Sequence, residues 1–253
     1  MVRLYDAAPA RPLFGPWPEA ILWACLQGVM GRVYGDRFQD PRSAAAVLGD
    51  FCFLAGEPNP GLLPAGGAKQ PYRILIPQTD RWAALIERVY GAGVRAITRY
   101  ATRKDPAAFD RAVLERAVRA LGPEYRMRTI DANTFALCRT QAWSRDLVAQ
   151  FDGFCAFQEL GLGVAVFYHG TLAAGASTYA RWRGGIEIEI DTREEFRRRG
   201  LARACGAQLI LHCLDRGLYP SWDAHSRASL ALAETLGYRL DHSYLAYEVG
   251  TPF

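Results

Sequence analysis

The run GGIEIEIDTREEFRRRGLARACG, residues 184–206, constrains the fold more than any other segment. Isoleucine and glutamate alternate over 185–190, and in a strand this period of two places the isoleucines on one face and Glu187 and Glu189 on the other. Arginines and a glycine follow, and then a stretch over 201–216 that is apolar nearly all round, which predicts a helix packed on a sheet. The order is therefore strand, cationic turn, buried helix.

The turn between this strand and helix has the chemistry of an anion site. Its sequence is Arg197-Arg198-Arg199-Gly200-Leu201-Ala202. The first N–H groups of a helix have no partner within the helix, and together with the helix dipole they attract anions. Gly200 would let the backbone approach an oxygen closely. The chain has neither a Walker-type phosphate loop nor a Gly-x-Gly-x-x-Gly dinucleotide fingerprint.

The rest of the chain divides into two predicted domains. The first, residues 1–130, is a smaller α/β domain: apolar runs predict strands over 51–56, 73–79, 94–102 and 125–131, and helical periodicity predicts helices over 80–90 and 105–121. Asp80 and Asp105 are the expected N-caps. The Gly- and Pro-rich stretch 56–71 predicts a surface loop, with a lid over substrate as the alternative.

The second predicted domain, residues 131–253, begins with a helical stretch over 134–151. An antiparallel meander over 161–192 follows, then the helix of 201–216, a strand over 218–224, a helix over 226–236 and a closing strand or hairpin over 238–249. The predicted fold class is thus α/β (α+β), in which the second domain has a mixed, mostly antiparallel central sheet flanked by helices.

The amino-acid composition argues against several classes of function. The net charge of +4 is too small to predict nucleic-acid binding, although an Arg-rich face leaves that reading open to a salt-dependence test. The six cysteines form no Cys-x-x-Cys pair, so no metal site and no disulfide framework are expected, and a reducing, cytoplasmic location fits. The apolar stretch 20–31 is too short to span a membrane and predicts a core helix.

The chain resembles the GCN5-related N-acetyltransferase (GNAT) superfamily. The six residues from Arg197 to Ala202 match its cofactor-loop pattern Gln/Arg-x-x-Gly-x-Gly/Ala, and LAETLGY, residues 232–238, resembles its second landmark. The resemblance covers about residues 131–249 and is strongest for a bacterial subgroup of similar length with an extra N-terminal domain. It implies acetyl-CoA as cofactor and acetyl transfer to the primary amine of a small molecule by direct attack on the thioester.

The resemblance also implies where the cofactor binds. The pantetheine arm would run beside the strand end Ile190-Asp191-Thr192 as an extra strand would, in an opening between two central strands. The pyrophosphate would lie on the amides of Arg198 to Ala202, with charge from Arg197 and its neighbours. Ser226 occupies the position where relatives have an asparagine that holds the cofactor, and Ser229 follows it on the same helix.

For catalysis the resemblance implies a base on the glutamate strand and an acid for the departing thiolate. Glu187 and Glu189 are the candidate bases, because a carboxylate can deprotonate an ammonium directly or through water. Many relatives carry the acid as a tyrosine where this chain has Ala233, so Tyr219, Tyr244 and Tyr247 are candidates and Tyr247 is preferred. Trp222 and Asp223 are expected to bind the substrate.

Three alternatives stay open. A non-catalytic, sensory protein that binds acyl-CoA would explain the missing tyrosine, whereas the paired glutamates favour an enzyme. The acceptor could instead be a protein N-terminus, because no motif decodes acceptor choice. The N-terminal domain could cover the acceptor site or form a homodimer contact.

Overall fold

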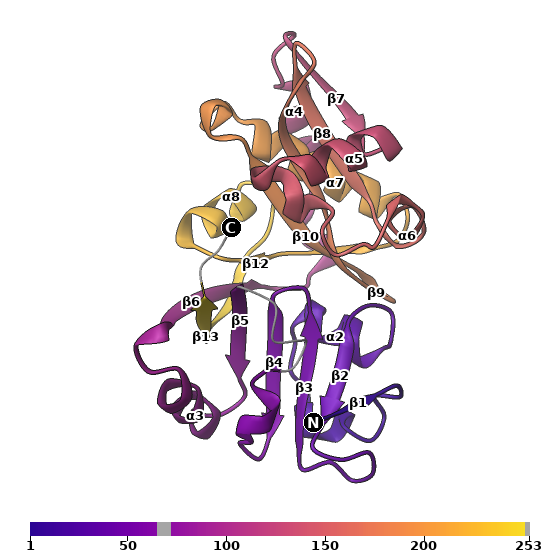
Figure 1. Cartoon of the computed structure of the whole chain (residues 1–253). Helices are drawn as coiled ribbons and strands as arrows, with labels where there is room; N and C mark the ends of the chain where they lie inside the picture. The colour runs from indigo at the N-terminus through magenta and orange to yellow at the C-terminus, as the bar shows by residue number, and fades with distance from the viewer. Residues whose placement is uncertain (65–71, 251–253) are drawn as a thin grey trace. The chain divides into compact units, whose positions relative to one another are not determined.

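The computed structural model describes residues 1–64 and 72–250 and divides the chain into two compact units (Figure 1). Unit 1 is Met1–Arg99 together with the chain from Ser243 onward, and unit 2 is Tyr100–His242. Residues 65–71 of the predicted loop lie outside the described residues. No helix in the described chain is long and apolar enough to cross a membrane.

Unit 1 is a mixed, mostly antiparallel sheet with short helices. Its strands lie in the order β1-β2-β3-β4-β5-β13-β6, and the β4–β5 pair is parallel. The bounds of these strands are β1 Val2–Leu4, β2 Arg32–Gly35, β3 Ser43–Leu48, β4 Phe51–Gly56, β5 Tyr72–Pro77, β6 Val94–Thr102 and β13 Leu240–Gly250. The end of β6, from Tyr100, and the start of β13, as far as His242, belong to unit 2. The helices are α1 Arg11–Phe14, α2 Ala20–Leu26, η1 Pro60–Leu62, α3 Asp80–Tyr90 and η2 Gly91–Gly93.

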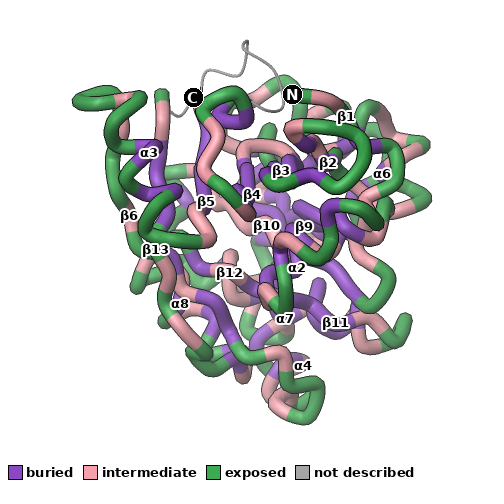
Figure 2. Tube along the Cα trace, turned by 90° about the horizontal axis from the view of Figure 1, so that it is seen from below, coloured by how far each residue is buried: buried purple, intermediate pink, exposed green. Residues whose placement is uncertain are grey.

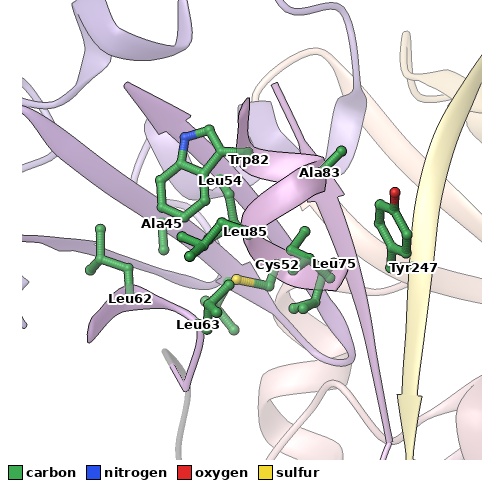
Figure 3. Packing of buried hydrophobic residues seen from close by; sticks show 12 residues of the cluster. Ala45, Cys52, Leu54, Leu62, Leu63, Leu75, Trp82, Ala83, Leu85 and Tyr247 are labelled. Atoms are coloured by element: carbon green, nitrogen blue, oxygen red, sulfur yellow. The ribbon is translucent and has the colours of Figure 1, made fainter. Parts of the chain in front are cut away.

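The core of unit 1 forms where α3 packs on the sheet. Trp82, Leu85 and Ile86 recur at helical spacing and are buried. Trp82 and Leu85 lie in one cluster with Leu54 and Tyr247 of the strands (Figure 3). The Trp82 indole N–H donates to the Gly56 carbonyl at 2.9 Å, which satisfies its one polar atom in the core.

Unit 2 contains a five-stranded sheet in the order β11-β10-β9-β8-β7, antiparallel except for the β10–β11 pair. The strands of this sheet are β7 Tyr125–Thr129, β8 Gly163–Tyr168, β9 Thr171–Trp182, β10 Gly185–Thr192 and β11 Tyr219–Ser221. A further short strand, β12 Asp223–Ala224, pairs with the end of β6. The helices are η3 Pro106–Ala108, α4 Arg111–Arg119, α5 Ala132–Thr140, η4 Ala142–Leu147, α6 Phe154–Leu160, η5 Glu194–Phe196, α7 Leu201–Leu214 and α8 Arg227–Glu234.

The central elements of unit 2 are the most buried. Most of β9 and α7 is buried, whereas the far half of β10 is only partly covered (Figure 2). The burial of α7 confirms the prediction of a helix that is apolar nearly all round and packs on a sheet. The predicted fold class, with mixed and mostly antiparallel sheets flanked by helices, is confirmed as well.

Several predicted boundaries differ from the structure for local reasons. The helix expected over 105–121 is two pieces: Asp105 caps the short η3, and Asp110 caps α4 through bonds from the N–H groups of Ala112 and Val113. The strand expected over 218–224 is broken into β11 and β12 at Trp222. Asp80 is the first residue of α3 and not its N-cap.

The compact units also divide the chain at places other than the predicted boundary at residue 130. β7 precedes that boundary but pairs with β8 along its whole length, so residues 100–130 belong with unit 2. At the other end, Tyr247 to Gly250 of β13 pair with β5 in unit 1. Pairings between distant segments such as these leave no periodic signal in the sequence.

β10 and β11 approach so closely at Gly185 that a side chain there would clash. A Cβ at this position would lie 2.0 Å from the Tyr219 carbonyl oxygen, which is backbone and cannot turn away. We therefore expect Gly185→Ala to lower the free energy of unfolding by about 1–3 kcal/mol in urea denaturation. In the control Gly93→Ala, where no atom lies within 4 Å of the new Cβ, the loss should stay within about 0.5 kcal/mol. Equal losses would contradict the close approach.

Candidate active site

The alternation along β10 separates an apolar face from an acidic face, as the sequence predicts. Ile186 is fully buried, and Ile188 and Ile190 pack against the core that includes α7. Glu187, Glu189 and Asp191 face the other way. A β-bulge falls between Glu187 and Ile188, and because its extra residue is on β9, the alternation of β10 continues through it.

η4 covers the acidic face of β10 at its far end. Gly175 of β9 is the register partner of Asp191, so their side chains would point the same way. A Cβ on Gly175 would lie 2.6 Å from Leu147 of η4, which places η4 over this face. We name the face that carries Glu187, Glu189 and Asp191 the carboxylate face.

β10 and β11 separate after three residue pairs. Gly185, Ile186 and Glu187 pair with Tyr219, Pro220 and Ser221, and there the pairing ends. The chain then turns to other partners. The Trp222 carbonyl accepts from Thr102 N at 3.3 Å and from Thr102 Oγ1 at 2.7 Å, and β12 pairs with the end of β6. Within the described chain, the β10 edge from Ile188 to Thr192 therefore has no strand on this side.

Glu187 lies at the point of separation and is 3% exposed. Its Oε1 accepts a hydrogen bond from the Asp223 amide at 2.6 Å, which links β10 to the residue after the break. Burial and the charge of Asp223 raise the pKa of Glu187 to about 7, against the opposing effects of Lys104, the Ser221 side chain and the Asp223 amide. A carboxyl group with this pKa changes its protonation state near neutrality.

Asp191 carries the second perturbed carboxyl group of the carboxylate face. Burial raises the pKa of Asp191 to about 6, and the negative charge of Asp146 in η4 adds to this, whereas the Thr192 amide and Arg197 oppose it. Burial also raises the pKa of Asp146. Glu189, between Glu187 and Asp191, is half-buried.

The predicted anion loop has the backbone of an open turn. Arg198 and Gly200 both have left-handed backbone conformations, with φ of +60° and +78°, and Gly200 is the N-cap of α7. A Cβ on Gly200 would meet no atom within 4 Å, so the space in front of the first turn of α7 is open. Leu201 is buried against the core and Ala202 is half-buried.

The arginine side chains of the loop have different surroundings. Arg197 Nε donates to the Thr192 carbonyl at 3.3 Å, which ties the loop to the end of β10. The Arg199 guanidinium lies over the Phe196 ring at 5.3 Å and donates to the Glu195 carbonyl at 3.0 Å. Part of the cationic cluster thus stabilises the loop itself.

Three of the predicted ligand-binding residues instead form a local network at α8. Ser226 is the N-cap of α8, and its Oγ accepts from Ser229 N at 3.2 Å. Ser229 Oγ in turn accepts from the Trp222 indole N–H at 3.1 Å. Trp222 is buried, and its ring contacts that of Tyr238 at 5.5 Å. Their predicted roles toward cofactor and substrate stay predictions, but each side chain has a structural role here.

Tyr247, the preferred candidate acid, belongs to unit 1. Its ring is buried in the core beside α3 (Figure 3), and its hydroxyl donates to the Glu87 carboxylate. Burial, followed by this hydrogen bond, raises the pKa of Tyr247 to about 12. The role as acid stays a prediction, and the bonded, buried hydroxyl favours a packing role.

The sequence analysis missed three residues that act on the carboxylate face. Ser221 and Lys104 act on Glu187, and Asp146 acts on Asp191. A signal for Lys104 is its rarity, since only it and Lys69 among the 30 basic residues are lysines. Among the described residues, no group of three or more His, Cys, Asp or Glu side chains could hold a metal ion.

The parallel strand pair that separates at a buried carboxylate, and the glycine loop that precedes a buried helix, agree with the class of acyltransferases that the sequence resembles. A family model described as GNAT acetyltransferase matches residues 11–247. The chain belongs to this family of acyltransferases. Membership supports acetyl transfer from an acyl-CoA in general.

Individual relatives agree with the family assignment. A Streptococcus suis 89/1591 crystal structure of a "GCN5-related N-acetyltransferase-like protein" is 50% identical, with a TM-score of 0.91 over 96% of this chain and 98% of that chain. The Bacillus subtilis (strain 168) protein "Uncharacterized N-acetyltransferase YdfB" is 23% identical over 179 residues, 70% of this chain and 66% of its own length. The chain thus spans just under two thirds of that relative.

A more distant structure shares the fold alone. The GCN5-related N-acetyltransferase from Kribbella flavida is 15% identical, with a TM-score of 0.53 over 99% of this chain and 96% of that chain. Together the comparisons confirm the GNAT resemblance, which the sequence analysis traced only from residue 131 onward. They do not assign an extra N-terminal domain.

Glu187 makes stability depend on pH in a way that Glu187→Gln should remove. Because its pKa is raised from 4.5 to about 7 in the folded protein, the stability that its protonated form contributes is complete below about pH 4.5 and is lost as the pH rises through 7. The loss by pH 8 is about 3 kcal/mol. Urea denaturation at pH 5 and pH 8 should therefore show Glu187→Gln gaining stability relative to the unmodified protein at the higher pH.

The control for this measurement is Glu159→Gln, which changes an exposed glutamate of α6. Its free energy of unfolding should differ from that of the unmodified protein by the same amount at both pH values. A Glu187→Gln difference that is also constant with pH would contradict the assignment of a raised pKa to Glu187.

Proposed function

We propose that this chain is an acetyl-CoA-dependent N-acetyltransferase that acts on the primary amine of a small molecule. The observation that carries the proposal is Glu187: a buried carboxyl group with a pKa of about 7, at the point where β10 and β11 separate. A general base is most effective when its pKa lies near the working pH.

Three observations on the residues around β10 support a binding site for acetyl-CoA. Among the described residues no strand pairs with β10 beyond Glu187 on this side, so the edge from Ile188 to Thr192 could pair with the amides of a pantetheine arm. Thr192 Oγ1 is buried with no hydrogen-bond partner among the described residues. The open N-terminal turn of α7 behind Gly200 could accept a pyrophosphate.

In the proposed reaction the bound cofactor supplies an acyl thioester. Glu187 accepts a proton from the substrate ammonium, directly or through a water, so that the neutral amine can attack. The Asp223 amide donates to Oε1 of Glu187 and holds the carboxylate in place. Arg197 and the amides from Arg198 to Ala202 bind and orient the pyrophosphate.

A cationic amine suits the charge of the carboxylate face. Glu189 and Asp191 lie on the same face as Glu187, and Asp223 adjoins it. These carboxylates would attract an ammonium group and hold it near Glu187 before deprotonation. The small-molecule acceptor, a cytoplasmic location and a homodimer remain predictions.

A second candidate function is a non-catalytic protein that binds acyl-CoA. Two observations favour it: Ala233 stands where relatives carry the acid tyrosine, and the hydroxyl of the substitute candidate Tyr247 is bonded to Glu87. This candidate keeps the cofactor loop and predicts no dependence of any reaction on Glu187.

Calorimetric titration with acetyl-CoA and with CoA tests the cofactor site. Gly200→Glu adds bulk and negative charge at the open N-terminus of α7 and should abolish binding of both ligands. Gly217→Glu is the matched control, because Gly217 lies just beyond the other end of α7 with a similar φ of +65° and equally open space. It should bind as the unmodified protein does. Equal loss of binding in both variants, or no binding by the unmodified protein, would contradict a cofactor site at the N-terminus of α7.

Kinetics of thiol release with a panel of amines test the base. Glu187→Gln should lower kcat about 10²–10⁴-fold while the Kd for acetyl-CoA is unchanged, because the base acts on the amine and not on the cofactor. Glu189→Gln, on the same strand face, should lose less. A larger loss at Glu189 would move the base there, and full turnover in both variants would favour the non-catalytic candidate.

A further inference from the structure

The segment Arg103–Asp105 is fastened to the hydroxyl of Tyr219 on both sides of Lys104. The hydroxyl donates to the Arg103 carbonyl at 2.7 Å and accepts from the Asp105 amide at 3.2 Å. Both bonds involve backbone atoms, so they fix the path of the chain whatever the neighbouring side chains do. Lys104 is thereby held at one place relative to β11.

Further bonds fix the chain around this segment. Thr102 is bonded to the Trp222 carbonyl through its amide and hydroxyl, and Arg103 N donates to the Arg239 carbonyl at 2.8 Å. Asp105 caps η3, where its side chain accepts from the Ala107 amide. The segment is thus an ordered strap along β11.

The register of β10 and β11 directs this strap toward Glu187. Tyr219 pairs with Gly185 and Ser221 pairs with Glu187, so in this parallel pair Tyr219, Ser221 and Glu187 share one face. The Tyr219 hydroxyl therefore anchors Lys104 on the side of the sheet to which the buried carboxylate points. Burial of Glu187 makes a nearby charge effective, because little water screens it.

The groups that act on Glu187 have opposing effects. Burial and Asp223 favour the protonated form, whereas Lys104, Ser221 and the Asp223 amide favour the ionised form. Tyr219 and Tyr238 also lie within electrostatic reach of Glu187, and both are neutral phenols whose pKa values burial raises. Lys104 is the group that contributes a positive charge to this set.

We propose that Lys104 is a positioning residue, held beside Glu187 by the Tyr219 hydroxyl, which keeps the carboxylate available to take a proton from the amine. This inference rests on the proposed function. Lysine fits the task better than arginine because its ammonium is a compact charge that needs no planar partner. Tyr219, a candidate acid in the sequence analysis, has its hydroxyl occupied by this task.

The test measures the ionisation of Glu187 directly, by carbon NMR of protein labelled at glutamate carboxyl groups. The Glu187 signal is identified by its absence in Glu187→Gln. Lys104→Met should raise the midpoint of the Glu187 titration by about one unit, because an opposite charge is lost. Lys104→Arg should keep the midpoint within a few tenths of a unit. Arg119→Met, which removes an exposed charge on α4, should leave it unchanged.

Tyr219→Phe completes the test, because it removes the hydroxyl and keeps the ring. It should raise the Glu187 midpoint in the unmodified protein but not in the Lys104→Met background, since Tyr219 acts through Lys104. In each variant the acid limb of the pH profile of kcat/KM should shift in the same direction and by the same amount as the NMR midpoint of Glu187. An unchanged midpoint in Lys104→Met, or additive shifts in the double variant, would overturn the inference.

The two proposals fail differently. The NMR titration needs neither cofactor nor amine, so shifted midpoints without any acetyl transfer would overturn the proposed function and leave the charge coupling of Lys104 to Glu187 in place. If acetyl transfer has the same pH profile in Lys104→Met as in the unmodified protein, the further inference is overturned and the proposed function stays in place.

Discussion

The hydrogen bond from the Asp223 amide to Glu187 is the interaction on which the site depends. It forms where β11 leaves β10, so a carboxylate oxygen of Glu187 bonds the second residue beyond the strand pairing. If β11 continued along β10, the edge from Ile188 to Thr192 would be closed by backbone bonds. The Trp222 carbonyl, bonded to Thr102, diverts the chain and keeps this edge open.

The same separation explains the electrostatics of unit 2. Glu187 lies at a break in the sheet and is 3% exposed, so desolvation is the largest influence on its pKa. Farther along β10, η4 places Leu147 beside Gly175, the register partner of Asp191. Burial and the charge of Asp146 in η4 raise the pKa of Asp191 there. The acidic face of the strand is therefore not the solvated face that alternation alone would suggest. Burial thus raises the pKa of Glu187 to about 7 and that of Asp191 to about 6 on a common strand pattern.

The outcome for single residues shows where sequence reasoning works. The position of β10, the turn at Gly200 and the helix that follows are fixed by local periodicity and by glycine's freedom at positive φ, and these agree with the structure. The chemical roles expected for Trp222 and Tyr247 stay predictions, and the structure adds that both pack in cores where the indole N–H and the hydroxyl have partners. Packing of a large aromatic depends on neighbours that are distant in the sequence.

The sequence by itself determined the class of protein through its resemblance to the GNAT superfamily, because the loop from Arg197 to Ala202 and the run 232–238 that carry it are local runs of adjacent residues. Only the tertiary structure decided which glutamate is buried, that Lys104 lies near it and that β7 belongs with the second half of the chain. The physical reason is that burial and charge coupling arise between segments about 40 to 120 residues apart, and no periodic pattern encodes such pairs.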